Sequence, residues 1–287
     1  MNKDSRRFHP ILNINYIQMK KMFLYFVIGF CCFPVMAQDK GIIPPAHKNK
    51  FHLYLLIGQS NMAGRGIVEA QDTLQNCRIL SLDKYGNWDA AKEPLHFDTP
   101  IAGVGPGFAF AKKIIEIADD TVVIGLIPCA AGGSGIDAWS PGVFWEQTLS
   151  FPYDNAIIRT KLAMKDGTLK GILWHQGESD CSPEKAKDYS NKLEHLIIGL
   201  RQEFDMPFLP FIAGEIQSKN NGDLINQALH KVKNKVPFYE VVFGSGFSFM
   251  ADSVHLDSRS EREFGRRYAE KMIEVQQISI NNVEEKR

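Results

Sequence analysis

The sequence is poor in cysteine, and this scarcity excludes several kinds of protein. Five cysteines occur in 287 residues, and no two have the Cys-x-x-Cys spacing. Two of them, Cys31 and Cys32, lie in an N-terminal segment that we expect to be removed. An odd remainder of three excludes a disulfide framework, although one bridge is compatible with an oxidising compartment. Cys129 ends an apolar run, so we interpret it as a core residue rather than a nucleophile.

An excess of charge of one sign is also missing. The chain holds 33 basic and 33 acidic residues. Without residues 1–37, 28 basic residues face 32 acidic ones, a net charge of −4. Nucleic-acid binding requires a basic surface, so we expect no nucleic-acid partner. The glycine-rich stretch 132–135 is not followed by Gly-Lys-Ser/Thr, and we therefore expect no phosphate-binding loop there.

Long apolar runs are absent apart from MFLYFVIGFCCFP, which is shorter than a membrane span of about 20 residues. Lys20 and Lys21 precede this run, and Val-Met-Ala ending at Ala37 follows it, which is the order of a secretory signal peptide. We expect cleavage after Ala37, a secreted or periplasmic location and no stable membrane span afterwards. A lipoprotein anchor is not expected, because no Leu-small-small pattern precedes either cysteine. We interpret 1–37 as an upstream extension and signal peptide, and 38–287 as one domain.

Apolar runs bounded by glycine alternate with helical patterns along this domain. Such alternation predicts a mostly parallel sheet covered on both faces, a doubly wound α/β fold in three layers. No internal repeat or low-complexity segment stands out. The expected strands are 51–57, 77–82, 121–128, 169–174, 208–213 and 238–243, and the expected helices are 106–118, 155–165, 183–204, 224–232 and a closing helix that includes 264–272.

Three polar clusters follow apolar strands, at the edge of the sheet where such folds bind ligands. Ser60 lies in the first cluster, where its simplest role is a helix N-cap. A nucleophilic serine needs a base and a group that orients the base. His255 is the candidate base. Asp252, three residues before it, and Glu178, from another strand end, are both candidate orienters, and the spacing does not choose between them.

An oxyanion hole would need backbone or side-chain donors near Ser60. The candidates are the Ser60 backbone N–H, the Gln176 side-chain amide and a glycine N–H from 103–107. Trp139 is either a platform on which a sugar ring stacks or a core residue. We assign structural roles to the other histidines within or beside the expected elements, namely His52, His175, His195 and His230.

The segments GQSNM, AGVGPGFAFA, GLIPCAAGGSGIDAW, WHQGESD and DSVHLD occur in this order. Together they resemble the sialate O-acetylesterase and acetylxylan esterase group of the SGNH hydrolase superfamily, which includes carbohydrate esterase family six. The resemblance covers roughly residues 50–275. It implies the three-layer α/β/α sandwich, no cofactor and no metal, and an acetylated carbohydrate as substrate.

The resemblance also implies roles for individual residues. Ser60 matches the nucleophile and His255 the base, with Asp252 or Glu178 as orienter. Gly105, rather than Gly107, matches the glycine of the oxyanion hole, and Gln176 stands where many relatives have an asparagine. We add four candidate substrate-binding residues: Gln59, Asn61, Gly133 and Trp139.

The resulting hypothesis is an exported serine esterase that removes acetyl groups from a carbohydrate. Two rivals stay open. A lipase or thioesterase on the same fold would need an apolar acyl groove, which the sequence does not reveal. A carbohydrate-binding protein with a relict site would be expected to have lost at least one of the residues named above. Loops 64–76, 134–152 and 244–251 would select the substrate.

Overall fold

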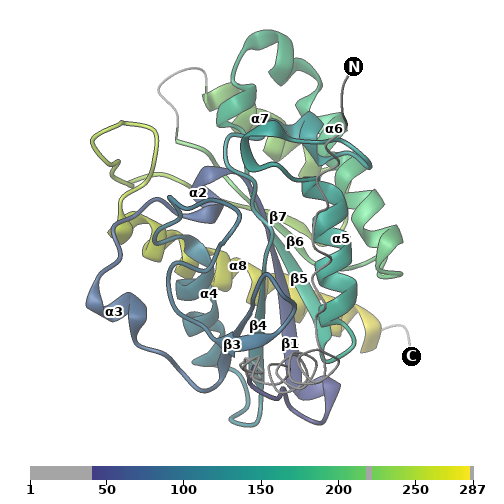
Figure 1. Cartoon of the computed structure of the whole chain (residues 1–287). Helices are drawn as coiled ribbons and strands as arrows, with labels where there is room; N and C mark the ends of the chain where they lie inside the picture. Colours follow the sequence, from purple (N-terminus) through teal and green to yellow (C-terminus); the bar gives the residue numbers. More distant parts are fainter. Residues whose placement is uncertain (1–40, 218–221, 285–287) are drawn as a thin grey trace, which may run out of the picture. The chain divides into compact units, whose positions relative to one another are not determined.

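The computed structural model describes residues 41–217 and 222–284 (Figure 1). Gly41–Arg287 forms one compact unit. The described residues of this unit form a sheet of seven strands in the order β3-β2-β4-β1-β5-β6-β7. All described strand pairs are parallel except β2 with β3, so the expected mostly parallel sheet is confirmed. The strands are β1 (Phe51–Gly58), β2 (Ile79–Leu82), β3 (Trp88–Ala90), β4 (Val123–Pro128), β5 (Thr168–His175), β6 (Phe211–Gly214) and β7 (Tyr239–Val242).

Helices cover both faces of this sheet. The longer helices are α4 (Pro106–Ile115), α5 (Pro152–Ala163), α6 (Pro183–Glu203), α7 (Gly222–Lys233) and α8 (Ser258–Glu284). In Figure 1, α4 and α8 lie on one face, and α5, α6 and α7 lie on the other. The expected three-layer α/β/α architecture is therefore confirmed. Shorter elements are α2 (Ser60–Ala63), α3 (Ala70–Thr73) and the 3-10 helices η1 (Lys48–Lys50), η2 (Ile136–Trp139), η3 (Glu146–Thr148) and η4 (Glu178–Asp180).

The central strand β1 is apolar on both faces, and this explains its place in the middle of the sheet. Leu53, Leu55 and Ile57 pack into the core beneath α5, α6 and α7. Tyr54 and Leu56 point the other way, into the core beneath α4 and α8. Each such side chain contributes roughly 1.5–3 kcal/mol when it leaves water. The strand is therefore fixed firmly, and so is the position of the residues that follow it.

Some boundaries differ from those expected. The strand expected over 208–213 is shorter, because Phe208 is 61% exposed and the pairing begins at Phe211. The helix expected from Asn155 starts three residues earlier, with Pro152 in its first turn, where proline needs no backbone donor. The edge strand β3 and the short helix α3 were not expected. Both have four residues or fewer, which is too short to display a period.

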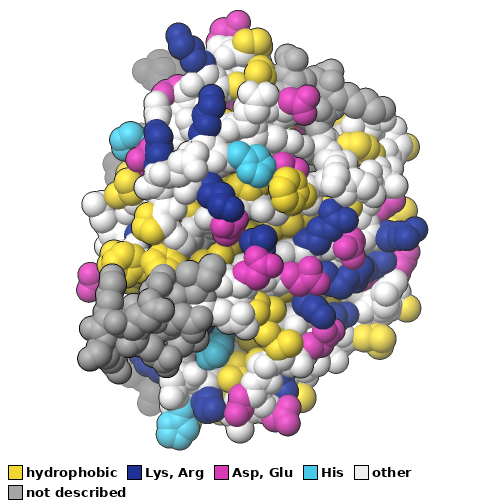
Figure 2. Space-filling model, turned by 180° about the vertical axis from the view of Figure 1, so that it is seen from behind, with side chains coloured by type: hydrophobic (Ala, Val, Ile, Leu, Met, Phe, Trp, Pro, Cys, Tyr) yellow, Lys and Arg dark blue, Asp and Glu magenta, His cyan; other side chains and the backbone are white. Residues whose placement is uncertain are grey.

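The expected signal peptide falls outside the described residues. Among the residues that the structure does describe, no helix has both the length and the apolar character to cross a membrane. On the face seen in Figure 2, basic side chains are interspersed with acidic ones. Ion pairs along α8, such as Arg266 with Glu263 and Lys271 with Glu274, are of this kind. On the coloured part of this face in Figure 2, the basic side chains therefore form no continuous surface.

Candidate active site

The polar clusters expected at the strand ends do converge. β1 pairs with β5, and Gly58 lies opposite His175 in the register. Gly58 has a φ of 135°, and a Cβ there would lie 2.0 Å from the His175 carbonyl oxygen, so only glycine fits. The Gln59 N–H donates to the same carbonyl at 2.9 Å. The segment that follows β1 is thus held directly against the segment that follows β5.

Ser60 is the first helical residue of α2, and Gln59 is the N-cap. The simple reading of Ser60 as an N-cap is therefore wrong. Its hydroxyl instead faces His255, with Oγ 3.0 Å from Nε2. Only 6% of Ser60 is exposed, so its hydroxyl lies in a largely buried turn.

His255 lies in the loop between β7 and α8, and Asp252 binds its other ring nitrogen. Asp252 Oδ2 is 2.7 Å from His255 Nδ1. The second oxygen, Oδ1, accepts the backbone N–H groups of Val254 and His255, both at 2.9 Å. The N–H of His255, its ring and the N–H of Val254 lower the pKa of Asp252 to about 2. The carboxylate is therefore charged at neutral pH, and Ser60, His255 and Asp252 form a continuous chain of polar contacts.

Among the described residues, Glu178, the other candidate orienter, forms its hydrogen bond and its ion pair with residues other than His255. Its Oε1 accepts a hydrogen bond from Asn61 Nδ2 at 2.6 Å and lies 3.5 Å from His175 Nε2. Burial alone would raise the pKa of Glu178, but the contacts with His175 and Asn61 hold it below its ordinary value. Of the two carboxylates that the sequence left open, Asp252 is the one in contact with the histidine.

The geometry does not fit the expected oxyanion role of Gln176. Its amide nitrogen, which has two hydrogens, lies within hydrogen-bond distance of three acceptors. These are Gln59 Oε1 at 3.0 Å, the Ser134 carbonyl at 3.0 Å and Asp180 Oδ2 at 2.6 Å. Gln176 is completely buried. Its amide therefore joins the loops that follow β1, β4 and β5, and no proton is left for a substrate.

Gly105 does lie against the turn that contains the nucleophile, but its N–H points elsewhere. A Cβ on Gly105 would lie 3.0 Å from the Met62 carbonyl oxygen, so the absence of a side chain permits the close approach. The N–H donates to the buried carboxyl of Glu93 at 3.4 Å. Burial raises the pKa of Glu93 to about 8. Of the expected oxyanion donors, the Ser60 N–H is the one that belongs to the nucleophile turn itself.

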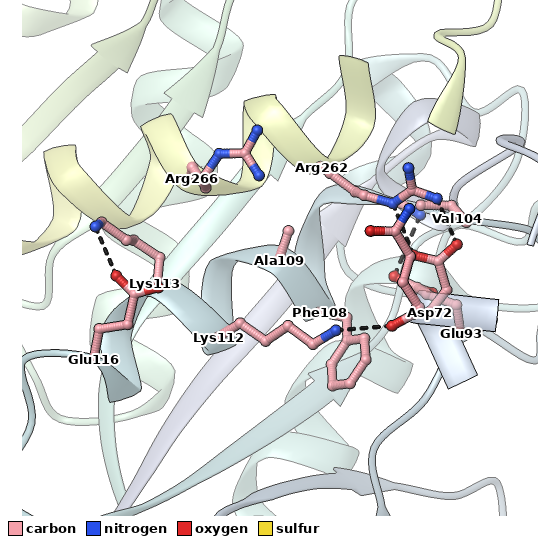
Figure 3. Close-up of a pocket in the computed structure, with 12 residues that line it drawn as sticks. Asp72, Glu93, Val104, Phe108, Ala109, Lys112, Lys113, Glu116, Arg262 and Arg266 are labelled. Atoms are coloured by element: carbon pink, nitrogen blue, oxygen red, sulfur yellow. Dashed lines mark hydrogen bonds and ion pairs between the residues drawn. The ribbon is translucent and has the colours of Figure 1, made fainter. Parts of the chain in front are cut away.

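A cavity of about 180 Å³ lies behind Gly105, between α3, α4 and α8. Figure 3 shows its charged lining, in which Arg262 faces Asp72 and Lys112 extends along α4. Arg262 Nη2 lies 2.6 Å from Asp72 Oδ2. Ser60 and His255 do not line this cavity. Arg262 thus joins α8 to α3, and Lys112 joins α4 to α3 by donating to the Gln71 carbonyl at 3.1 Å.

The expected substrate-binding residues are mostly in structural positions. Trp139 is 2% exposed and packs edge-on against Trp174, with ring centroids 5.3 Å apart, so it is a core residue and not a sugar platform. The Gln59 side chain, also buried, accepts hydrogen bonds from Gln176 Nε2 and the Ser179 N–H. The Gly133 carbonyl accepts the Ser179 hydroxyl at 2.8 Å.

The sequence reading missed an exposed aromatic pair. The rings of Phe144 and Phe151 lie 5.1 Å apart, and the residues are 46% and 43% exposed. Trp145, next to Phe144, donates its indole N–H to the Gly132 carbonyl, which ties this loop to the strand-end loops. Neighbouring large apolar residues within a predicted loop were the sequence signal from which this exposed pair could have been predicted. Within the described residues, no group of three or more metal-ligating side chains occurs.

The sheet order, the three layers and the Ser–His–Asp chain at the carboxyl ends of the strands define an SGNH-type α/β/α hydrolase fold. The model of one protein family, described as carbohydrate esterase, sialic acid-specific acetylesterase, matches residues 50–274. The chain belongs to this family. Carbohydrate acetylesterase activity is therefore the function that the family supports.

Two relatives illustrate the match. A probable carbohydrate esterase of Arabidopsis thaliana is 34% identical over 234 residues, which cover 74% of this chain and 86% of the relative. Its X-ray structure superposes with a TM-score of 0.71, covering 78% of this chain and 98% of that one, at 33% identity. A probable 9-O-acetyl-N-acetylneuraminic acid deacetylase of Escherichia coli is 22% identical over 207 residues, covering 57% of this chain and 63% of that protein.

Proposed function

We propose that this protein is an exported serine esterase that removes O-acetyl groups from a carbohydrate through an acetyl-serine intermediate. The observation that carries the proposal is the contact chain from Ser60 Oγ through His255 to Asp252, with distances of 3.0 and 2.7 Å. A nucleophile, a base and an orienting carboxylate are the groups that acyl transfer requires. Family membership supplies the substrate class.

In the first half-reaction, His255 Nε2 takes the proton of the Ser60 hydroxyl as Oγ attacks the acetyl carbonyl carbon. The charged Asp252 stabilises the imidazolium that forms and holds the tautomer whose Nδ1 carries the proton. The tetrahedral intermediate collapses, its bond to the sugar oxygen breaks, and the imidazolium returns the proton to that oxygen. The sugar leaves with a free hydroxyl, and the acetyl group stays on Ser60.

In the second half-reaction, a water molecule takes the place of the sugar. His255 removes a proton from the water, which attacks the acetyl carbonyl, and the Ser60 oxygen leaves with that proton. Acetate is the second product. The Ser60 backbone N–H, at the start of α2, is our candidate donor to the oxyanion in both halves, because the first N–H groups of a helix have no partner within it.

The type of acetylated sugar is open between acetylxylan and sialate. The name of the Escherichia coli relative favours an O-acetylated sialic acid, but its identity to this chain is only 22%. The exposed rings of Phe144 and Phe151 offer apolar surfaces on which a pyranose ring could pack, in the loop 134–152 that we expect to select the substrate. Export rests on the expected signal peptide in residues 1–37.

The first experiment measures acetate release by the wild type and by Ser60→Ala. The substrates are acetylated xylan, O-acetylated sialic acid and a synthetic acetyl ester. We expect kcat to fall by several orders of magnitude in the variant, with the residual rate that persists when a triad member is lost. Near-normal release by a correctly folded Ser60→Ala protein would refute the mechanism. The preferred natural substrate of the wild type would identify the sugar.

A further inference from the structure

The loop that contains His255 needs an anchor to the turn that contains Ser60. Asp252 and His255 are three residues apart in one loop, and their contact is therefore local. About 48% of the Asp252 side chain is exposed, against 23% for His255. If the loop shifted, both residues would move together and the contact would survive. Asp252 can orient the ring within the loop, but it cannot fix the distance from His255 to Ser60.

Asn61 provides the missing connection. It follows Ser60 directly in α2 and is 4% exposed. Its Oδ1 accepts the Leu256 N–H at 3.1 Å, and its Nδ2 lies 3.4 Å from the Val254 carbonyl oxygen. One amide thus contacts the backbone on both sides of His255. Because Asn61 and the nucleophile share one helical turn, this contact sets the position of the base relative to Ser60.

Glu178 determines how the Asn61 amide is turned. Its Oε1 accepts from Asn61 Nδ2 at 2.6 Å, the shortest of the three amide contacts. A carboxylate can accept but not donate, so the NH₂ end of Asn61 must face Glu178 and the oxygen must face Leu256. Only 9% of the Glu178 side chain is exposed. Water therefore competes little for this hydrogen bond, which is stronger because its acceptor is charged.

We propose that Asn61 and Glu178 are positioning residues that act in series on the catalytic base. Glu178 fixes the Asn61 amide, and Asn61 holds the backbone around His255 so that Nε2 stays within reach of the Ser60 hydroxyl. This inference rests on the proposed function of Ser60 and His255. It replaces two roles expected from the sequence: Asn61 as a substrate ligand and Glu178 as a direct partner of the histidine.

Exchanging the amide of Asn61 and the carboxylate of Glu178 between the two positions tests the contact between these residues. Asn61→Asp places two carboxylates against each other and should lower kcat about 100-fold, the scale expected for an approximately 1 Å misplacement of a reacting group. Glu178→Gln keeps an acceptor oxygen and should lower kcat about tenfold. In the double variant Asn61→Asp/Glu178→Gln, the glutamine NH₂ can donate to the new carboxylate, which still accepts from Leu256.

We expect the double variant to recover to within about tenfold of the wild type, a coupling of the size seen between residues in direct contact. Recovery would be incomplete, because the Val254 carbonyl would lose its donor. KM for a synthetic acetyl ester should stay nearly constant in all three variants, since neither side chain contacts substrate in this proposal. Glu240→Gln on β7, which breaks a partly exposed ion pair with Lys233, is the matched control.

A double variant no more active than Asn61→Asp would overturn the proposal. So would a Glu178→Gln loss as large as that of Asp252→Asn, because Glu178 would then act on the base by its charge. If Asn61→Asp fails to fold, the alanine variants of Asn61 and Glu178 and their combination replace it, and strictly multiplicative losses would count against the proposal. Wild-type activity in Ser60→Ala would instead refute the underlying mechanism, whatever the result of the exchange.

Discussion

Replacing Asp252 by asparagine tests the electrostatic half of the proposed mechanism. The substitution keeps the size of the side chain and removes its charge. Asparagine can still accept the N–H groups of Val254 and His255 through Oδ1, which now bind the carboxylate at 2.9 Å. Its NH₂ group would then face His255 Nδ1. That nitrogen would have to accept the hydrogen bond, and the proton would move to Nε2, where the ring could no longer act as a base toward Ser60.

The charge contribution follows from distance and exposure. A carboxylate and an imidazolium with their charges about 4 Å apart attract by about 4 kcal/mol at an effective dielectric constant of 20, and by about 1 kcal/mol in water. Asp252 is about half exposed, so the true value lies between these limits. Since about 1.4 kcal/mol corresponds to a factor of ten, and the tautomer change adds to the loss, we expect kcat to fall roughly 10²- to 10³-fold.

The assay is acetate release from a synthetic acetyl ester, followed as kcat and KM at neutral pH. Asp252→Asn should lower kcat and leave KM nearly constant, because Asp252 acts on His255 and not on the substrate. A loss in kcat below about threefold would refute the role assigned to Asp252.

Two further predictions concern buried residues outside the triad. Burial raises the pKa of Glu93 from its ordinary value of 4.5 to about 8. Between these two pH values the folded protein binds a proton that the unfolded chain has lost. The free energy of unfolding should therefore fall as pH rises, by up to roughly 5 kcal/mol. In Glu93→Gln, the free energy of unfolding measured by chemical denaturation should differ less between pH 5 and pH 8 than it does in the wild type. The same difference in both proteins would contradict the argument. Trp139→Ala should lower the free energy of unfolding by about 3–5 kcal/mol. At temperatures where the variant is folded, its KM for the acetylated sugar should equal that of the wild type. A raised KM together with normal stability would show that Trp139 contacts substrate.

The parts of the fold that the sequence predicts are those set by local patterns. The double-sided apolar pattern of β1 places it inside the sheet, and Phe264, Tyr268 and Met272 repeat at the helical period and are all buried in α8. Serine, aspartate and histidine after apolar strands indicate a shared edge, because parallel strands all end on the same side. These inferences need no knowledge of distant partners.

The details that the sequence does not predict depend on distant segments. The amide of Gln176 has the right chemistry for an oxyanion donor, yet Gln59, Ser134 and Asp180 take up its hydrogens. Trp139 has the right chemistry for a sugar platform, yet it packs on Trp174 in the core. In both cases the side chain fits two roles, and tertiary neighbours decide which one it fills.

The choice between Asp252 and Glu178 has the same origin, and it also explains why both carboxylates are present. A base in a solvent-exposed loop has two separate needs: its ring must be turned correctly within the loop, and the loop must be held against the nucleophile. A residue three positions away can satisfy the first need but not the second, because it moves with the loop. The second requires a group on the nucleophile's own segment, which is Asn61. An amide can turn by half a rotation at little cost, so it needs a partner that accepts but cannot donate. Buried Glu178, 2.6 Å from the Asn61 nitrogen, is such a partner.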